Sequence, residues 1–170
     1  MAESGRITLD VSSTNYITGY IEWSESDVSI EGNTSVVTAS LVYSHGGGVA
    51  TGNNSSDFYL VVNGSRVERT NGYTLYPGNT YKVLTQTVTV QHDVDGSKSI
   101  RIEGGGGIKG TTGLSASSGG ATVALTTIFR TVWVKVSGAW KRAIPYWKSG
   151  NAWRQALPYV KSGGNWKIGV

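Results

Sequence analysis

Residues 83–92, VLTQTVTVQH, carry the clearest structural signal in this chain. The threonines and the apolar residues alternate, so they fall on opposite sides of an extended strand, with Gln86 as the exception. One side holds Thr85, Thr87 and Thr89, and the other holds Leu84, Val88 and Val90. A period of two predicts a half-buried β-strand, because a helix repeats its apolar face about every 3.6 residues.

The same alternation recurs in six other runs of strand length. These are residues 7–11, 16–23, 35–43, 58–62, 98–103 and 121–127. Turn-forming pairs separate several of the runs, namely Asn63-Gly64, Asn71-Gly72, Pro77-Gly78 and Asp95-Gly96. With 170 residues, 24 of them glycine, and only 15% charged residues, the chain is poor in helix formers. It predicts an all-β fold, an antiparallel β-sandwich of jelly-roll or immunoglobulin type.

Two predicted connections are longer than a hairpin needs, residues 44–56 and 104–120. Long loops in a compact domain are either functional or merely mobile, so both remain open as a candidate binding rim. His45 lies in the first loop and is a candidate ligand-binding residue.

The sequence offers little for catalysis. The absence of cysteine excludes disulfides, thiolate metal sites and thiol nucleophiles, and two histidines are too few for a histidine-rich zinc site. The stretch GGGGIKGTT at 104–112 lacks the lysine directly before Ser/Thr that a phosphate-binding loop requires. We therefore expect a non-enzymatic protein without a cofactor or a metal.

Charge divides the chain into two regions. Residues 1–128 hold all eleven acidic residues and seven basic ones, for a net charge of −4. Residues 129–170 hold eight basic residues and no acidic one, for a net charge of +8, together with five of the six tryptophans. We predict a β-sandwich domain over residues 1–128 and a separate basic, tryptophan-rich region over residues 129–170.

The second region is a repeat of 13 residues. It reads VKVSGAWKRAIPY at 134–146, WKSGNAWRQALPY at 147–159 and VKSGGNWKIGV at 160–170. Each unit has a short strand, a turn rich in serine, glycine and asparagine, and a returning strand with a tryptophan, which predicts a β-hairpin. A lone hairpin is marginally stable, so the three hairpins are expected to pack on one another, on the sandwich or on other copies of the chain.

Alternation in the returning strands predicts one apolar face and one cationic face for each hairpin. The apolar residues would form the repeat core: Trp140, Trp153, Trp166, Ile144, Leu157 and Ile168. The basic residues would form a docking face: Lys135, Lys141, Lys148, Arg154, Lys161 and Lys167. The tryptophans have two open interpretations, an aromatic ladder that joins the hairpins or flat platforms for a ligand.

Trp147 departs from the repeat, because the other two units have Val134 and Val160 at its position. It is therefore the tryptophan least explained by a ladder and the leading candidate for ligand binding. Tyr146, Tyr159 and Trp133 are further candidates.

Three stretches of the sandwich region resemble a known family: TGYIEWSES at 18–26, VQHDVDGSKSIRIE at 90–103 and LTTIFR at 125–130. Residues 1–130 resemble the β-sandwich module of minor structural proteins in tailed bacteriophages of siphovirus type. The repeats resemble the YVKxGGxWK-type repeats at the C-termini of phage virion proteins. Phe129 stands where that family has proline.

The resemblance implies a viral structural protein on the virion surface, made in the cytoplasm of the host bacterium. Its place would be the viral tail tip, a fibre or the head surface, with other virion proteins as partners. It implies a homo-oligomer, for which a trimer is one arrangement. It also implies a link to host attachment through cell-surface glycans.

Two functions follow with nearly equal support. The first is host attachment, in which the aromatic residues bind carbohydrate and the basic residues favour anionic cell-wall polysaccharide. The second is purely structural, with the basic repeats docking or oligomerising the protein. Nucleic-acid binding ranks third, because the acidic sandwich would repel the polymer. The sequence predicts no membrane association and no secretion signal.

Overall fold

The computed structural model describes residues 3–14, 16–129, 132–156 and 158–168, and the regular structure in these ranges is entirely β-strand. The sandwich consists of β1 (Ser4–Thr8), β2 (Asp10–Ser12), β3 (Ile17–Ser29), β4 (Thr34–His45), β5 (Thr51–Val62), β6 (Ser65–Leu75), β7 (Thr80–Gln91), β8 (Ser99–Gly105) and β9 (Ala116–Ala124). The C-terminal hairpins consist of β10 (Val132–Val136), β11 (Ala139–Ala143), β12 (Tyr146–Ser149), β13 (Ala152–Gln155), β14 (Tyr159–Ser162) and β15 (Asn165–Ile168). The predicted all-β fold with C-terminal hairpins is confirmed.

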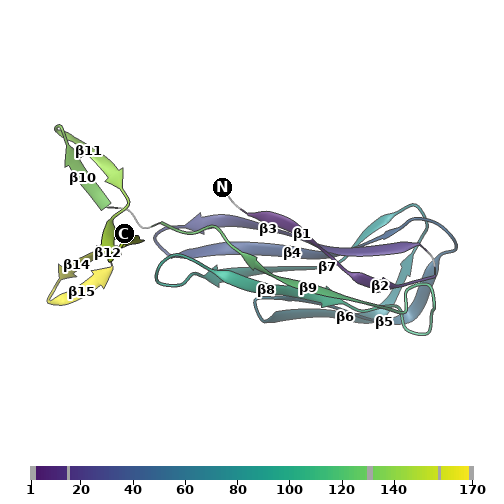
Figure 1. The fold of residues 1–170 in the computed structure, drawn as a ribbon. Coiled ribbons are helices and arrows are strands. Elements are labelled where there is room, and N and C mark those ends of the chain that lie inside the picture. Colours follow the sequence, from purple (N-terminus) through teal and green to yellow (C-terminus); the bar gives the residue numbers. More distant parts are fainter. Residues whose placement is uncertain (1–2, 15, 130–131, 157, 169–170) are drawn as a thin grey trace.

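Two antiparallel sheets pack face to face as a β-sandwich (Figure 1). The strand order is β1-β3-β4-β7 in the first sheet and β2-β9-β8-β5-β6 in the second. Between β1 and β2 the chain passes from one sheet to the other, and the buried side chain of Leu9 marks the crossing. The β1–β2 segment thus closes one side of the sandwich.

The core lies between the sheets and is built from the alternating apolar residues of both. Its largest buried side chains include Ile21, Leu41, Tyr43, Phe58, Leu60 and Ile102. Aromatic rings extend the core toward β6 and β7, with centroid distances of 5.4 Å from Tyr43 to Phe58 and 5.9 Å from Phe58 to Tyr73. In β7 the three predicted outward threonines are exposed and Val90 is buried, which confirms the period of two.

The turn prediction holds at Asn63-Gly64 and fails at Asn71-Gly72. Asn63 and Gly64 have φ of 50° and 80° and form the two-residue connection between β5 and β6. Asn71 and Gly72 instead lie inside β6, opposite β5. A Cβ at Gly72 would lie 3.0 Å from the carbonyl oxygen of Asn53, so this glycine permits close approach of two backbones.

Both long connections are shorter than predicted. Strands β4 and β5 extend into the first, which leaves only residues 46–50 between them, and β8 and β9 reduce the second to residues 106–115. The glycines where β8 leads into the second connection are closely packed. A Cβ at Gly105, the last residue of β8, would lie 2.1 Å from the carbonyl oxygen of Ser117. Close packing, and not chain mobility, therefore accounts for glycine there.

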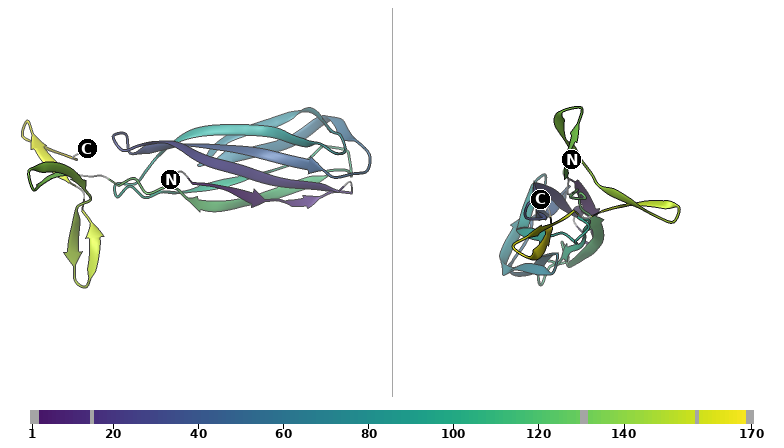
Figure 2. Two further views of the ribbon diagram at one scale, coloured as in Figure 1. Left: turned by 90° about the horizontal axis from the view of Figure 1, so that it is seen from above. Right: turned by 90° about the vertical axis from the view of Figure 1, so that its left-hand side faces the viewer.

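The molecule is elongated, with the hairpins at one end of the sandwich (Figures 1 and 2). Leu125 and Ile128, which follow β9, are buried in the sandwich, and the backbone NH of Ile128 donates to the carbonyl of Gly96 at 2.9 Å. This packing anchors the chain at the end of the sandwich from which the hairpins project.

Candidate interaction surface of the C-terminal hairpins

Each C-terminal unit forms one two-stranded antiparallel sheet, as the repeat predicted. The first turn is Ser137-Gly138, with φ of 51° and 83°, and the third is Gly163-Gly164, with φ of 60° and 84°. Positive φ at both residues gives the twist that two-residue hairpins prefer. Strands of four or five residues end at these turns.

The register places a lysine directly opposite a tryptophan in every hairpin. The pairs are Lys135 with Trp140, Lys148 with Trp153 and Lys161 with Trp166. Opposite residues of an antiparallel pair share one face of the sheet. The predicted separation into an apolar and a cationic face is therefore wrong, because the alternation within one strand ignores what the partner strand contributes.

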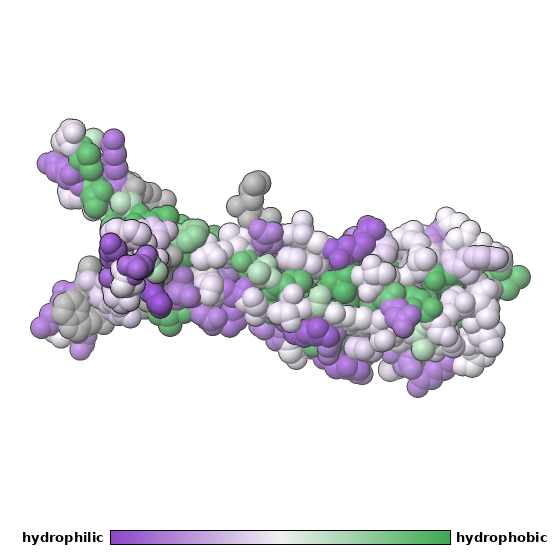
Figure 3. Space-filling model, viewed as in Figure 1, coloured by the Kyte–Doolittle hydropathy of each residue, from purple (hydrophilic) through white to green (hydrophobic). Residues whose placement is uncertain are grey.

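The other face of the hairpins is also mixed. There Val134 lies opposite Lys141, and Trp147 lies opposite Arg154. Hydrophobic and hydrophilic residues accordingly stand side by side over the hairpins in the space-filling view (Figure 3). The first two hairpins thus present apolar and cationic groups together on both faces.

The three members of the predicted repeat core whose side chains the structure describes do not pack together as a core within one chain. The exposed fraction is 64% for Trp140 and 68% for Trp153, and Ile144 is exposed as well. The three hairpins diverge from one another, and their described strands make very few contacts with each other or with the sandwich (Figure 2). Leu157 and the side chains of Trp166 and Ile168 lie outside the described residues.

The aromatic ligand candidates are exposed but dispersed. Trp133 is on β10, Tyr146 and Trp147 are neighbours on β12, and Tyr159 is on β14. All four side chains are at least half exposed. Adjacent residues of a strand point to opposite faces, so Tyr146 and Trp147 do not form one platform.

The predicted basic residues Lys135, Lys141, Lys148, Arg154 and Lys161 are exposed on the hairpins. The side chain of Lys167 lies outside the described residues. The ion pairs Arg66–Glu68, Lys82–Glu22, Lys98–Asp93 and Arg101–Glu103 lie within the sandwich. The described side chains of Lys135, Lys141, Lys148 and Arg154 take part in none of these pairs.

Exposed carboxylates gather at the end of the sandwich that faces the hairpins. We call them the acidic collar: Glu3, Asp27, Glu31, Asp93 and Asp95. The side-chain amide of Asn33 donates to the carbonyls of His92 at 3.0 Å and Asp93 at 2.9 Å, which joins the β3–β4 turn to the β7–β8 turn. Sequence analysis missed the collar because its members are far apart in the chain, although the acidic charge of the sandwich was a partial signal.

Beneath the collar lies a buried polar network. The carboxylate of Glu25 accepts from the backbone NH of Thr126 at 2.9 Å and of Glu3 at 3.3 Å. His92 has its Nε2 2.8 Å from the Ser35 hydroxyl and 3.8 Å from the Glu25 carboxylate. Burial raises the pKa of Glu25, but hydrogen bonds from Thr126, Ser35 and Glu3 outweigh it, so that the pKa lies below its ordinary value.

The Ser35–His92–Glu25 group is structural and is not built like a nucleophilic triad. In such a triad the carboxylate contacts the histidine nitrogen that does not face the serine. Here the His92 Nδ1 lies 3.0 Å from the carbonyl oxygen of Gly96, and the side chains of His92 and Glu25 are fully buried. A substrate has no access to this serine.

His45 lies at the opposite end of the sandwich from the aromatic candidates (Figure 1). It is buried, and its Nε2 is 3.0 Å from the carbonyl oxygen of Val49. The two shortened connections meet nearby and line a cleft of about 360 Å³ with residues 49–52 and 110–113. The structure therefore separates His45 from the other ligand candidates.

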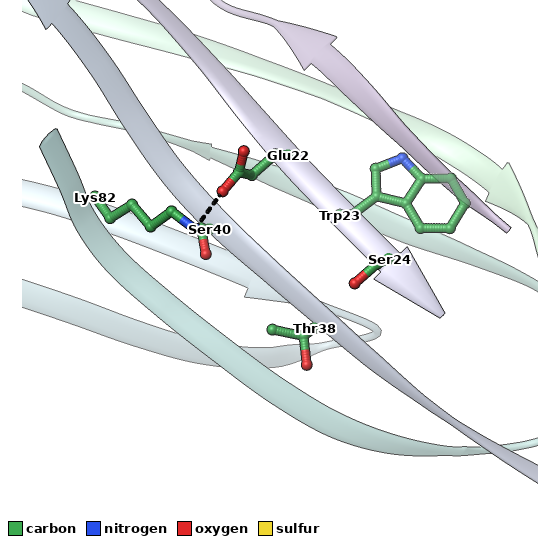
Figure 4. Close-up of a pocket in the computed structure, with 6 residues that line it drawn as sticks. All are labelled: Glu22, Trp23, Ser24, Thr38, Ser40 and Lys82. Carbon is green, nitrogen blue, oxygen red and sulfur yellow. Dashed lines mark ion pairs between the residues drawn. The ribbon is translucent and has the colours of Figure 1, made fainter. Parts of the chain in front are cut away.

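A second hollow lies on the outer face of the first sheet (Figure 4). It measures about 240 Å³, and the Lys82 ammonium pairs with the Glu22 carboxylate across it at 2.7 Å. The remaining lining residues are Trp23, Ser24, Thr38 and Ser40. Its only carboxylate is already paired, so the hollow has no free acid or base.

The described residues contain no group of three or more His, Cys, Asp or Glu side chains that could hold a metal ion. They also include no helix of the length and apolar character that spanning a membrane requires. A scan against protein-family models, a search of curated proteins and a search of solved structures found no match.

Proposed function

We propose that this chain is a non-enzymatic structural protein of a virion, with the sandwich as an elongated spacer and the C-terminal hairpins as an association arm. The observation that carries the proposal is the exposure of Trp133, Trp140, Trp147 and Trp153 on the first two hairpins. The resemblance to tailed-phage proteins supports the virion setting. The role of the arm is to join the protein to other copies or to other virion proteins.

Solvent exposure of so many large aromatic rings is unfavourable in a free monomer. Burial of one such ring removes roughly 150–250 Å² from water, and extensive exposed apolar surface marks interaction sites. Tryptophan, tyrosine and arginine are also the residues enriched at the energetic centres of protein interfaces. Of the three ways to bury the hairpins, packing on one another and packing on the sandwich are scarce among the described strands, which favours an external partner.

The association arm is tested with the double variant Trp140→Ala/Trp153→Ala in the full chain. We expect light scattering after size exclusion to give an oligomer for the wild type and a monomer for the variant. Truncation of exposed side chains at the other end of the sandwich, Val49→Ala/Tyr76→Ala, serves as the control and should leave the oligomer intact. A monomeric wild type at all concentrations, with no binding to purified virion proteins, would contradict the proposal.

A second candidate function is binding of anionic cell-wall polysaccharide, favoured by one specific pair. Trp147 is half exposed and lies opposite the exposed Arg154, so a flat apolar surface and a cation share one face. An aromatic plane suits the apolar face of a sugar ring, and the guanidinium suits phosphate.

For this second candidate, we expect Trp147→Ala to weaken binding to purified teichoic acid by at least about tenfold, since it removes the apolar platform. Isothermal titration measures the change. Trp140→Ala is the matched control, because Trp140 is an exposed tryptophan on another hairpin and lies opposite a lysine, not an arginine. Equal loss in both variants would show general surface adhesion and would exclude a site at Trp147.

A further inference from the structure

We infer that the hairpins of one copy dock on the acidic collar of a neighbouring copy, so that the chains assemble side by side with their hairpins at one end. The inference rests on the proposed role of the hairpins as an association arm and names their partner. The two surfaces that would meet are the mixed aromatic and cationic faces of the hairpins and the collar end of the sandwich.

The collar is complementary in charge to the hairpins. Its five carboxylates are exposed, and Lys98 neutralises part of it through a 2.9 Å ion pair with Asp93. The hairpins carry basic residues and no acidic ones. Two surfaces of opposite sign attract and orient each other, and salt weakens this attraction.

The collar is also complementary in its apolar content. Val28 and Val94 are exposed between its carboxylates, with exposed fractions of 38% and 58%, and Phe129 beside it is 43% exposed. These side chains offer the hairpin tryptophans an apolar contact within an acidic surrounding. A purely polar anion would leave the tryptophans and these three residues exposed.

A second copy fits better than an unrelated acidic protein, because every chain carries both surfaces. They lie at the same end of an elongated body, and the hairpins diverge from the axis of their own sandwich (Figure 2). Contact of one chain's hairpins with the next chain's collar is heterologous, and such contacts close into a ring when the rotation from each copy to the next adds up to a full turn. A closed ring buries all the hairpins without free ends.

The test uses charge reversal on each surface of the full chain. The collar variant is Glu3→Lys/Glu31→Lys, and the hairpin variant is Lys141→Glu/Lys148→Glu. In about 50 mM salt, we expect each to weaken self-association by at least about tenfold, as measured by sedimentation. The chain that carries all four substitutions should recover the wild-type oligomer, because the complementary signs are restored. The control variant Asp10→Lys/Glu68→Lys has the same change in net charge as the collar variant but lies away from the collar. It should have little effect on self-association.

Mixing separates contact between copies from contact within one chain. The collar variant and the hairpin variant, each with a different fluorescent label, should form mixed oligomers when combined. Monomers in every sample, with a salt-dependent hydrodynamic radius, would show that the hairpins fold onto their own collar and would overturn the inference. An oligomer that is lost in Trp140→Ala/Trp153→Ala but unchanged in the collar variant would also overturn it, while leaving the association arm in place.

Discussion

At the scale of single residues, Glu25 links three parts of the chain. Its carboxylate holds the backbone of Glu3 at the start of β1 and of Thr126 after β9, and its side chain is fully buried beside His92. A buried acceptor of this kind stabilises the fold only while it is ionised and hydrogen-bonded. The hydrogen bond that holds Thr126, where the chain leaves the sandwich, therefore depends on the protonation state of Glu25.

Acid should destabilise the sandwich through Glu25. Its pKa in the folded state is lowered from 4.5, so its stabilising contribution is complete above that value and disappears as pH falls through the folded-state pKa. We expect Glu25→Gln to reduce the free energy of unfolding at pH 7 by about 1–3 kcal/mol and to flatten its dependence on pH below about 5. Urea unfolding at several pH values measures both.

Glu31→Gln is the matched control, because Glu31 is an exposed member of the collar. It should keep nearly the wild-type stability at pH 7. Equal pH profiles for the wild type and Glu25→Gln would show that other carboxylates cause the acid destabilisation.

At the scale of elements, sequence alternation predicted most strands but not their lengths or their partners. The period of two in residues 83–92 was sufficient for β7, because one face of that strand is solvent-exposed. The alternation of apolar and polar residues did not predict β6. This strand lies at an edge of the second sheet, and its arginines, glutamate and glycine break the pattern. The spacing of residues along the chain does not reveal close contacts between two backbones. For this reason the sequence alone places Gly72 and Gly105, which lie within strands, in a turn and a loop.

The hairpins show a second limit of the sequence. A repeat of 13 residues predicts three equivalent units and their turns, and the structure bears this out. The face on which each tryptophan meets a lysine depends on register, which the turn residues determine. The acidic collar was beyond prediction for the same reason, since it joins Glu3 before β1, Asp27 near the end of β3, Glu31 in the β3–β4 turn and two residues of the β7–β8 turn.

Removal of the hairpin elements should leave the sandwich equally stable. A chain that ends at residue 131 keeps β1–β9 and the buried Leu125 and Ile128, and the described hairpin strands make very few contacts with the sandwich. In about 500 mM salt, where contacts between copies are weakened, we expect its unfolding midpoint to lie within about 2 °C of the full chain. Differential scanning calorimetry measures it. A decrease of several degrees would show that the hairpins pack on their own sandwich.

At the scale of the whole molecule, charge is segregated along the long axis. Residues 129–170, which include the hairpins, hold +8, and the acidic collar occupies the adjoining end of the sandwich. The far end carries exposed Tyr16, Val49 and Tyr76 around the connections that line the cleft near His45. An assembly through the hairpins leaves that far end free and directs it away from the point of attachment.

This polarity makes the 46–50 connection a convenient place for foreign sequence. A Cβ at Gly47 would meet no atom within 4 Å, so the chain there has open space around it. In an assembly held together by the hairpins, an epitope inserted between Gly47 and Gly48 would be displayed at the end opposite the hairpins, once per subunit, without touching the surfaces that join the copies.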